Sequence, residues 1–470
     1  MSAAIERQRA QLRELIGPDC VLTAPEEMAA ALVDQRHLYH GRALAVLLPR
    51  EVAQIARVVR WCNEQRVGLV PQGGNTGYCG GATPDESGTQ VVLALRRFDR
   101  IRAIDVGNFS LVAEAGCVLA NVQQAAAAAG RYFPLSLGSE GSCQIGGNLA
   151  TNAGGLNVLR YGMARDLVLG IEAVLPEGQL LDGLKSLRKD NTGYDLRSLL
   201  IGSEGTLGII TAASLKLWPA LRSTATAFVA ISDPTHALAL LERLRSGAVD
   251  RLSSFELLPR AAIELTQQHR HASDPFDQPY PWYILCELTS SSEEPLDDLL
   301  QRLLADAAER ALILDAALAT SERVRSAFWR LRELVPEAQR LAGLSLKHDI
   351  SVPVASIPQF IHSASRWVAD HVPEALLICY GHAGDGNLHF NVNGIGAEAS
   401  AALRAREPEI RRAIHDLVAR YHGSISAEHG IGRLKRDELA HYGSPVALAA
   451  MRTLKRALDP NGIMNPGKML

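Results

Sequence analysis

The stretch Gly138-Ser-Glu-Gly-Ser-Cys-Gln-Ile-Gly-Gly-Asn-Leu-Ala-Thr-Asn-Ala-Gly-Gly155 is rich in glycine and in small neutral polar side chains. Two similar stretches are Pro71-Gln-Gly-Gly-Asn-Thr-Gly-Tyr-Cys-Gly-Gly81 and Gly202-Ser-Glu-Gly-Thr-Leu-Gly208. Because glycine has no Cβ, the backbone can approach a ligand closely, and successive amides can converge on phosphate oxygens. Any one stretch could be an ordinary turn, but three of them beside predicted strands favour a site for a large phosphate-bearing cofactor.

Two common nucleotide-binding motifs are absent from the sequence. The chain contains neither GxGxxG nor GxxxxGK[ST], which disfavours a Rossmann dinucleotide site and a P-loop. We therefore expect the cofactor in a different fold. The glycine stretches place neutral donors near it, namely Asn75, Thr76, Asn148, Thr151 and Asn152.

The composition is that of an ordinary globular protein. Of 470 residues, 47% are hydrophobic and 21% charged, and 48 Lys and Arg against 51 Asp and Glu give a net charge of −3. This balance offers no basic patch for nucleic acid, and no stretch approaches the roughly 20 apolar residues of a transmembrane helix. The charged start Met1-Ser-Ala-Ala-Ile-Glu-Arg7 lacks the apolar core of a secretory signal. The seven scattered cysteines form no CxxC pair, so we expect buried thiols and a cytoplasmic protein.

Hydrophobic periodicity divides the chain into four parts. Residues 1–38 are predicted as N-terminal helices, 39–219 as a cofactor domain, 220–444 as a second domain and 445–470 as a C-terminal segment. In the second domain long helices alternate with strands, which predicts an α+β fold with an antiparallel sheet covered on one face. The expected helices are 235–246, 296–309, 321–341, 357–370, 407–422 and 445–458, and the expected strands are 225–231, 282–289 and 374–381.

A predicted β-hairpin in the second domain carries two histidines. Its strands flank the turn Ala383-Gly-Asp-Gly-Asn387, so that His382 and His389 can face each other. Asn391 lies two residues after His389 and shares its face of the strand, while Phe390 points the other way.

A second turn-like segment adds a carboxylate. Ser426-Ala-Glu-His-Gly-Ile-Gly432 is predicted to end a short strand in a glycine turn that presents Glu428 and His429. Two imidazoles and one carboxylate match a catalytic divalent-metal site. No HExxH motif is present, so zincin chemistry is not indicated. Arg332 on a predicted helix and Lys347 at a predicted strand start are, taken alone, ordinary surface charges.

Taken together, these motifs resemble the FAD-dependent D-2-hydroxyacid dehydrogenases of the vanillyl-alcohol-oxidase superfamily. That family includes D-2-hydroxyglutarate dehydrogenases, D-lactate dehydrogenases and the FAD subunit of glycolate oxidase. The resemblance implies an α+β fold with a p-cresol-methylhydroxylase-type FAD-binding domain, a cap domain for substrate and metal, and a C-terminal segment that returns to the flavin. The motifs that carry it are PQGGNTGYCGG, GSEGSCQIGGNLATNAGG, GSEGTLGIIT, LKHDISVP, GHAGDGNLHFNV, SAEHGIG and DPNGIMNPGK.

The resemblance also implies how FAD is held. Some relatives bind flavin covalently through a histidine in the first loop, whereas this chain has Asn75 there, so noncovalent FAD is expected. The implied FAD-binding residues are Pro71, Gly73, Gly74, Asn75, Thr76, Gly77, Gly138, Ser142, Gly146, Gly147, Asn148, Thr151, Asn152, Gly205, Ile210 and Asn465.

The remaining implied residues concern metal and substrate. By resemblance, His382, His389 and Glu428 would bind a divalent metal, with Zn²⁺ expected and Mn²⁺ as the alternative. The implied substrate-binding residues are Arg332, Lys347, Asn391 and His429, with His429 as the base. Some dicarboxylate-using relatives carry a hydroxyl side chain one helical turn after the arginine, whereas this chain has Pro336. That difference weakens the case for hydroxyglutarate.

The implied reaction is oxidation of a D-2-hydroxy acid to the 2-oxo acid, with hydride transfer to flavin N5. D-2-hydroxyglutarate is the first expected substrate and D-lactate the next. Without a nicotinamide motif, an electron-transfer flavoprotein or a quinone-linked carrier is the expected electron acceptor. Two alternatives stay open, a glycolate-oxidase-type FAD subunit of a hetero-oligomer and a flavin-free metal hydrolase. A homodimer also stays open.

Overall fold

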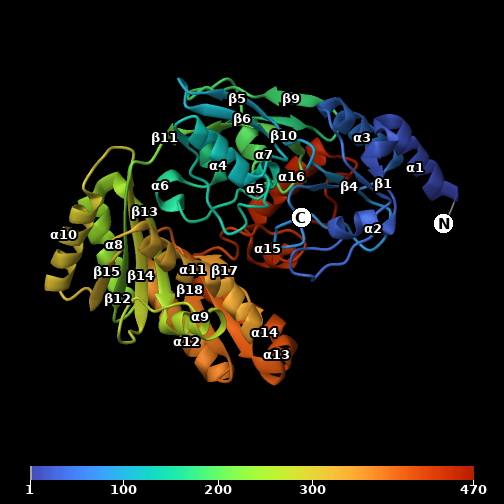
Figure 1. Cartoon of the computed structure of the whole chain (residues 1–470). Helices are drawn as coiled ribbons and strands as arrows, with labels where there is room; N and C mark the ends of the chain where they lie inside the picture. The colour runs from blue at the N-terminus through green and yellow to red at the C-terminus, as the bar shows by residue number, and fades with distance from the viewer. Residues whose placement is uncertain (1–2) are drawn as a thin grey trace. The chain divides into compact units, whose positions relative to one another are not determined.

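The computed structural model describes residues 3–470, so Met1 and Ser2 of the charged start lie outside the described residues. The described chain forms two compact units, coloured by residue number in Figure 1. Unit 1 contains the residues up to Gly154 together with 162–220 and 428–470, and unit 2 contains 155–161 and 221–427.

The first sheet of unit 1 consists of β1 (Val21–Leu22), β2 (Ala45–Leu47), β4 (Val91–Ala94) and β3 (Leu69–Gln72), in that order. β2, β4 and β3 run parallel, and β1 pairs antiparallel with β2 at the edge. Alternate residues of these strands belong to two different hydrophobic clusters, so both faces of the sheet are buried, as is usual for parallel strands. α1 (Ala3–Ile16) and α3 (Val52–Gln65) cover one face.

The second sheet of unit 1 is antiparallel throughout. Its strands are β5 (Ile101–Asp105), β6 (Ser110–Glu114), β10 (Ile209–Lys216), β8 (Val168–Val174) and β9 (Leu180–Gly183), in that order. All seven residues of β8 are buried because it lies inside the sheet. The short helix α5 (Ile145–Ala150) lies within the long glycine stretch, and α4 (Leu119–Ala128) precedes that stretch.

Both ends of the chain belong to unit 1. Of the N-terminal helices predicted over residues 1–38, α1 is observed, and the residues after it form only the short α2 (Pro25–Met28) and a 3₁₀ turn, Ala29–Ala31. Leu12 and Ile16 share a core with the first sheet. After α16 (Pro445–Leu458), Met464 forms a parallel bridge with Leu69 of β3.

The unit boundaries differ from the predicted ones in two places. Unit 1 ends its second segment at Ala220, next to the predicted boundary at 219, but it resumes at Glu428 rather than at 445. The reason is that residues after Glu428 hydrogen-bond to Glu204 and Cys79 of unit 1. Residues 155–161 leave unit 1 and join unit 2, where Ser254 Oγ donates to the Leu156 carbonyl.

The first sheet of unit 2 is antiparallel, with the order β13 (Leu252–Pro259), β14 (Trp282–Ser290), β12 (Ser223–Ile231) and β15 (Asp315–Leu318). α8 (Pro234–Ala248) and α10 (Leu296–Glu309) pack on one face, and α9 (Arg260–Arg270) and α11 (Glu322–Ala342) pack on the other. The prediction of a sheet covered on one face is therefore wrong for this sheet. Along β12, β13 and β14, residues of both parities are almost all buried.

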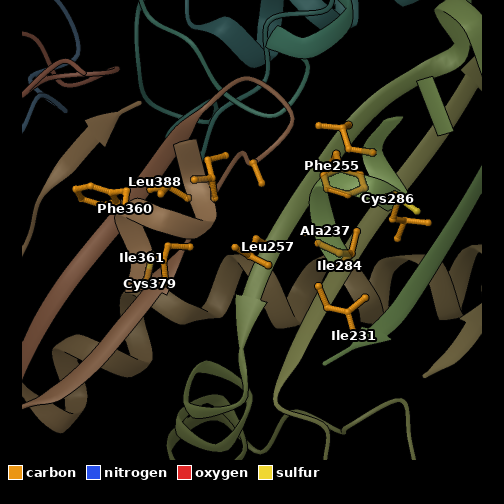
Figure 2. Close-up of a cluster of buried hydrophobic side chains, with 14 of the residues drawn as sticks. Ile231, Ala237, Phe255, Leu257, Ile284, Cys286, Phe360, Ile361, Cys379 and Leu388 are labelled. Atoms are coloured by element: carbon orange, nitrogen blue, oxygen red, sulfur yellow. The ribbon is translucent and has the colours of Figure 1, made fainter. Parts of the chain in front are cut away.

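The second sheet of unit 2 is built around β19 (Asn387–Ile395), which pairs antiparallel with β16 (Gly343–Leu346), β17 (Asp349–Ser351) and β18 (Leu376–Tyr380). The predicted hairpin of β18 and β19 is confirmed. One face of this sheet packs on α12 (Ile357–His371) and α14 (Glu407–Arg420). Figure 2 shows Leu388 and Cys379 of this face beside Phe360 and Ile361 of α12.

Two further expectations concern the whole chain. All seven cysteines are buried thiols, as predicted. Among residues 3–470, every helix is too short or too polar to span a bilayer.

Candidate active site

The first two glycine stretches meet in unit 1. A Cβ on Gly73, directly after β3, would lie 3.3 Å from the backbone nitrogen of Gly147 at the start of α5. A Cβ on Gly74 would lie 2.3 Å from the Ser142 carbonyl oxygen, and one on Gly146 would lie 2.7 Å from Ala115 Cβ. These glycines are required because two segments of backbone approach each other closely.

Other glycines of the same stretches face open space. A Cβ on Gly77, Gly138 or Gly147 would meet no atom of the described chain within 4 Å. Side chains at these positions would therefore fit the protein alone. Their absence leaves room for a bound group, so the loops fit a large cofactor that lies against the backbone.

Unpaired polar atoms border the same loops. Four side-chain oxygens are shielded from solvent and have no hydrogen-bond partner among residues 3–470, namely Thr83 Oγ1, Gln144 Oε1, Asn148 Oδ1 and Asn465 Oδ1. Shielded polar atoms are normally paired, so such a group calls for an explanation such as a missing ligand. A flavin and its ribityl chain carry N–H and O–H donors that could pair with these oxygens. The unpaired oxygens and the open glycines together fit FAD.

The C-terminal segment is held at this place by specific contacts. The Asn465 N–H donates to the Leu69 carbonyl (2.8 Å), and its Nδ2 group donates to the carbonyls of Gly81 (2.9 Å) and Glu204 (2.8 Å). The Asp459 carboxylate accepts from the backbone N–H of Met464 (2.9 Å). The return of Asn465 to the glycine loops is thus built into unit 1.

Several of the other predicted FAD residues shape the loops through their own hydrogen bonds. Asn75 Nδ2 donates to the Val33 carbonyl (2.8 Å), and Thr151 Oγ1 donates to the Gly147 carbonyl (3.2 Å). Asn152 Oδ1 accepts from a backbone N–H (2.8 Å), and Ser142 Oγ donates to a backbone carbonyl (3.3 Å). Pro71, Thr76, Gly205 and Ile210 lie in unit 1 as well. Contact of these residues with FAD stays a prediction.

In unit 2, the second sheet has one polar face that carries most of the remaining predicted residues. Asp349 pairs with His389 and Leu346 pairs with Val392, so Lys347 occupies the register position opposite Asn391. Directly opposed residues in an antiparallel sheet share a face. We call the face defined by Lys347, Asp349, Tyr380, His389 and Asn391 the polar face. Residues of the opposite parity, such as Leu388, Phe390 and Val392, belong to the apolar cluster.

The two hairpin histidines come together as predicted. The ring centroids of His382 and His389 lie 5.6 Å apart, with an interplanar angle of 75°. His382 is buried and His389 is partly buried. His389 Nδ1 also lies 3.9 Å from a carboxylate oxygen of Asp349 on β17. Two imidazoles this close can share one divalent cation.

A buried carboxylate that the sequence analysis missed lies beside them. Glu256 of β13 is 1% exposed, and its Oε1 lies 2.5 Å from His382 Nδ1. Its Oε2 accepts from Arg332 Nε at 2.7 Å. Burial by itself would raise the pKa of Glu256, but the charges and hydrogen bonds of His382 and Arg332 outweigh it and lower the pKa to about 2. Glu256 is thus an ionised partner of one predicted metal ligand and one predicted substrate residue.

The guanidinium group of Arg332 is held in one orientation by two neighbouring side chains. The guanidinium lies over the Tyr380 ring, 4.7 Å from the centroid, while Glu256 takes its Nε edge. Arg332 is 7% exposed, so it is not the surface charge that its sequence context alone suggests. Any carboxylate bound by Arg332 must use the Nη groups, which suit a planar two-oxygen ligand. Lys347 is partly buried at the edge of the same sheet.

Asn391 is oriented by a buried row of amides. Its Nδ2 group donates to Gln339 Oε1 (3.2 Å), and Gln339 Nε2 donates to Asn393 Oδ1 (3.1 Å). Asn393 Nδ2 in turn donates to the carbonyls of Leu376 (2.9 Å) and Asn391 (3.0 Å). Because carbonyl oxygens only accept, they fix the direction of the whole row. Asn391 therefore presents its oxygen, which has no partner among residues 3–470.

The segment that carries Glu428 and His429 is irregular, and the short strand predicted to end there is not observed. Residues 425 and 427–429 form bends, and Ser424 forms an isolated bridge with Ser351. The Ala427 N–H donates to the Asp349 carbonyl (3.3 Å). Ala427 is the last residue of unit 2, and Glu428 is the first residue of the closing segment of unit 1.

His429 is fixed in unit 1 by a turn that encloses a second missed carboxylate. The Glu204 carboxylate accepts from the backbone N–H groups of Ile431 (2.7 Å) and Gly432 (2.7 Å). Burial raises the pKa of Glu204, although these two hydrogen bonds act in the opposite direction. Gly430 has φ +72°, and a Cβ there would lie 2.8 Å from Glu204. The predicted turn at Gly430 is therefore confirmed, and Tyr78 contacts the His429 ring at 4.8 Å between centroids.

Two family models match this chain. One is described as "FAD linked oxidases, C-terminal domain" and covers residues 220–469, and the other is described as "FAD binding domain" and covers residues 43–183. The chain belongs to the FAD-linked oxidase family. The predicted family and enzyme class, an FAD-dependent dehydrogenase, are confirmed. An FAD-binding domain leaves no support for the flavin-free hydrolase alternative.

This FAD-linked oxidase has similar curated relatives. It is 38% identical over 461 residues to "D-2-hydroxyglutarate dehydrogenase, mitochondrial" of Arabidopsis thaliana, covering 97% of this chain and 80% of that protein. It is 34% identical over 459 residues to "D-2-hydroxyglutarate dehydrogenase" of Stutzerimonas stutzeri, covering 98% of each. The name of the Arabidopsis thaliana protein places that protein in mitochondria. The cytoplasmic location of this chain stays a prediction.

The fold of this FAD-linked oxidase also matches solved structures. The structure of p-cresol methylhydroxylase with substrate bound superposes with a TM-score of 0.78 at 17% identity, covering 100% of this chain and 97% of that one. The predicted p-cresol-methylhydroxylase-type α+β fold is confirmed.

Proposed function

We propose that this FAD-linked oxidase oxidises a D-2-hydroxy acid to the 2-oxo acid with help from a divalent metal. The observation that carries the proposal is the polar face of unit 2, where the His382 and His389 rings lie 5.6 Å apart and Glu256 joins His382 to the oriented cation Arg332. Imidazoles suit a catalytic cation, and an oriented guanidinium suits a carboxylate. Relatives named D-2-hydroxyglutarate dehydrogenase support a 2-hydroxy acid.

In this proposal each residue has one task. Arg332 and Lys347 bind the carboxylate oxygens and orient the substrate. His382, His389 and Glu428 hold Zn²⁺, with Mn²⁺ as the alternative. His429 takes the proton of the C2 hydroxyl while the C2 hydrogen leaves as hydride, so the acid loses two electrons and two hydrogens. When bound, the cation supplies positive charge at the C2 oxygen and the noncovalent FAD supplies the hydride acceptor.

D-2-hydroxyglutarate is the first proposed substrate and D-lactate the second. The relatives favour the dicarboxylate. Pro336 argues against D-2-hydroxyglutarate. It lies inside α11 one turn after Arg332 and offers no hydroxyl for a distal carboxylate. For the electron acceptor we propose an electron-transfer flavoprotein or a quinone-linked carrier. The glycolate-oxidase-type subunit is the second candidate function, and it predicts little activity for the purified chain alone.

A dye-linked screen with both enantiomers of several 2-hydroxy acids tests the proposal. We expect reduction of the dye with D-2-hydroxyglutarate or D-lactate and none with the L-enantiomers. A yellow, metal-loaded protein that oxidises neither enantiomer of any of these acids would contradict it.

The cations should then show which end of the substrate they bind. Arg332→Ala and Lys347→Ala should chiefly raise KM, because uniform binding is lost rather than transition-state stabilisation. A larger loss with D-2-hydroxyglutarate than with D-lactate assigns that residue to the distal carboxylate, and equal losses favour a monocarboxylate substrate. Arg340→Ala, on an exposed position of α11, is the control. Unchanged KM in both variants would show that neither cation binds substrate.

A further inference from the structure

Glu256 is the one charged residue of strand β13. β13 reads Leu-Ser-Ser-Phe-Glu-Leu-Leu-Pro, and all of its residues are buried. Ionised carboxylates are seldom buried unless they are paired, because water solvates them far better than a protein interior does. Glu256 is paired twice, with His382 through Oε1 (2.5 Å) and with Arg332 through Oε2 (2.7 Å).

The contact with His382 determines which ring nitrogen can reach a metal. Because Glu256 takes Nδ1, a cation held by His382 would bind its Nε2. Metal-binding histidines commonly use a carboxylate in this way to fix the tautomer and the ring orientation. His382 contacts Glu256 through a hydrogen bond, whereas His389 lies near Asp349.

The contact with Arg332 determines which edge of the guanidinium can reach a substrate. Glu256 takes the Nε edge and Tyr380 covers one flat side. A carboxylate ligand must then approach the Nη groups. The two oxygens of one carboxylate therefore set the orientation of two groups that lie on different elements, α11 and the end of the β18 strand.

We propose that Glu256 is a positioning residue that links the metal site to the substrate site, by fixing His382 for the cation and Arg332 for a substrate carboxylate. This inference rests on the proposed function. Glu256 itself touches neither ligand. The competing explanation is a buried ion pair that only stabilises the fold, and such pairs are known to contribute little net stability.

The test is Glu256→Gln, which keeps the size of the side chain but leaves one accepting oxygen for two donors. The protein is purified with FAD, and its affinity for Zn²⁺ is measured by competition with a chelator. We expect the affinity to fall about 10- to 100-fold, as is typical for loss of a ligand's hydrogen-bond partner. Glu287→Gln is the matched control, because Glu287 of the neighbouring β14 is also buried and accepts from Thr226 and Trp329.

The effect of Glu256 on substrate binding is tested at saturating Zn²⁺ with a double-mutant cycle of Glu256 and Arg332. Glu256→Gln should raise KM for the D-2-hydroxy acid in the wild-type background and should not raise it further in the Arg332→Ala background, since the effect acts through Arg332. A general loss of fold would instead add to the Arg332→Ala effect. Added Zn²⁺ should restore metal occupancy but not KM.

Several outcomes would overturn the proposal that Glu256 links the metal site to the substrate site. One such outcome is a Zn²⁺ affinity that does not change, and another is a KM effect that is additive with Arg332→Ala. Either result, together with a lower melting temperature, would show that Glu256 only stabilises the fold. If Glu256→Gln does not fold, Glu256→Asp keeps the charge but withdraws the carboxylate by one methylene, and the same two losses are expected. Failure of the proposed function itself would appear in the wild type, as absence of Zn²⁺ binding or of hydroxy-acid oxidation.

Discussion

Replacing His429 with alanine should lower turnover by about 10²- to 10⁴-fold, the range typical for loss of a general base. The variant should keep its FAD and its metal. The turn is fixed independently of the imidazole, because Glu204 accepts from the N–H groups of Ile431 and Gly432 and Gly430 supplies the left-handed conformation. The His429 side chain itself contacts the Tyr78 ring. Steady-state rates with a dye acceptor, flavin absorbance and elemental analysis measure the three properties.

The predicted metal ligands should behave differently from His429. His382→Ala, His389→Ala and Glu428→Ala should lose metal and activity but keep FAD, because every predicted FAD-binding residue lies in unit 1 and the two histidines lie in unit 2. A chelator should inactivate the wild type without removing its yellow colour. His441→Ala, on the exposed side of helix α15 (Arg436–Tyr442), is the control. Full activity after complete removal of metal would show that the hairpin histidines are structural.

Replacing Gly147 with phenylalanine should give a folded protein that contains almost no FAD and is therefore inactive. A Cβ at Gly147 would meet no atom of the described chain within 4 Å, so the protein alone has room for a side chain. The same space is the predicted place of the cofactor, bordered by Asn148, whose side-chain oxygen lacks a partner among residues 3–470. The ratio of flavin absorbance to protein absorbance, with circular dichroism to verify folding, measures the effect.

The neighbouring glycine provides the control for this prediction. A Cβ at Gly146 would lie 2.7 Å from Ala115 Cβ, so Gly146→Phe should reduce the yield of folded protein rather than selectively remove FAD. Overpacking of a tight contact usually destabilises a protein by about 1–3 kcal/mol. Full flavin content in Gly147→Phe would show that this part of the glycine stretch does not contact the cofactor.

Most helices of unit 2 could be predicted from the sequence because each has one apolar side. α10 matches its expected range, and α8, α11, α12 and α14 differ from theirs by one or two residues. β13 and α9 were not predicted. β13 is buried on both faces and shows no alternation of apolar and polar residues, and such a run cannot be distinguished from a buried helix by periodicity alone.

The candidate site could be predicted only where residues lie close together in the sequence. His382 and His389 flank one turn, so a hairpin brings them together. Glu256 lies far from both in the sequence, and only the pairing of sheets in unit 2 brings it to His382 and Arg332. The sequence contained one sign of this contact: a single carboxylate in a largely apolar strand is expected to have a buried partner. Gln339 carries no such signal, because a glutamine in a helix is commonplace.

The bridge between Leu69 and Met464 has a consequence for how the protein is made. Ribosomal synthesis proceeds from the N-terminus, so β3 and the first glycine loop emerge long before the segment that pairs with them. During that interval all of unit 2 is synthesised, while Asn465 is still missing from the Gly81 and Glu204 carbonyls. A nascent chain should therefore be unable to retain the cofactor until translation has passed Asn465, and a ribosome stalled within α16 should carry a colourless intermediate.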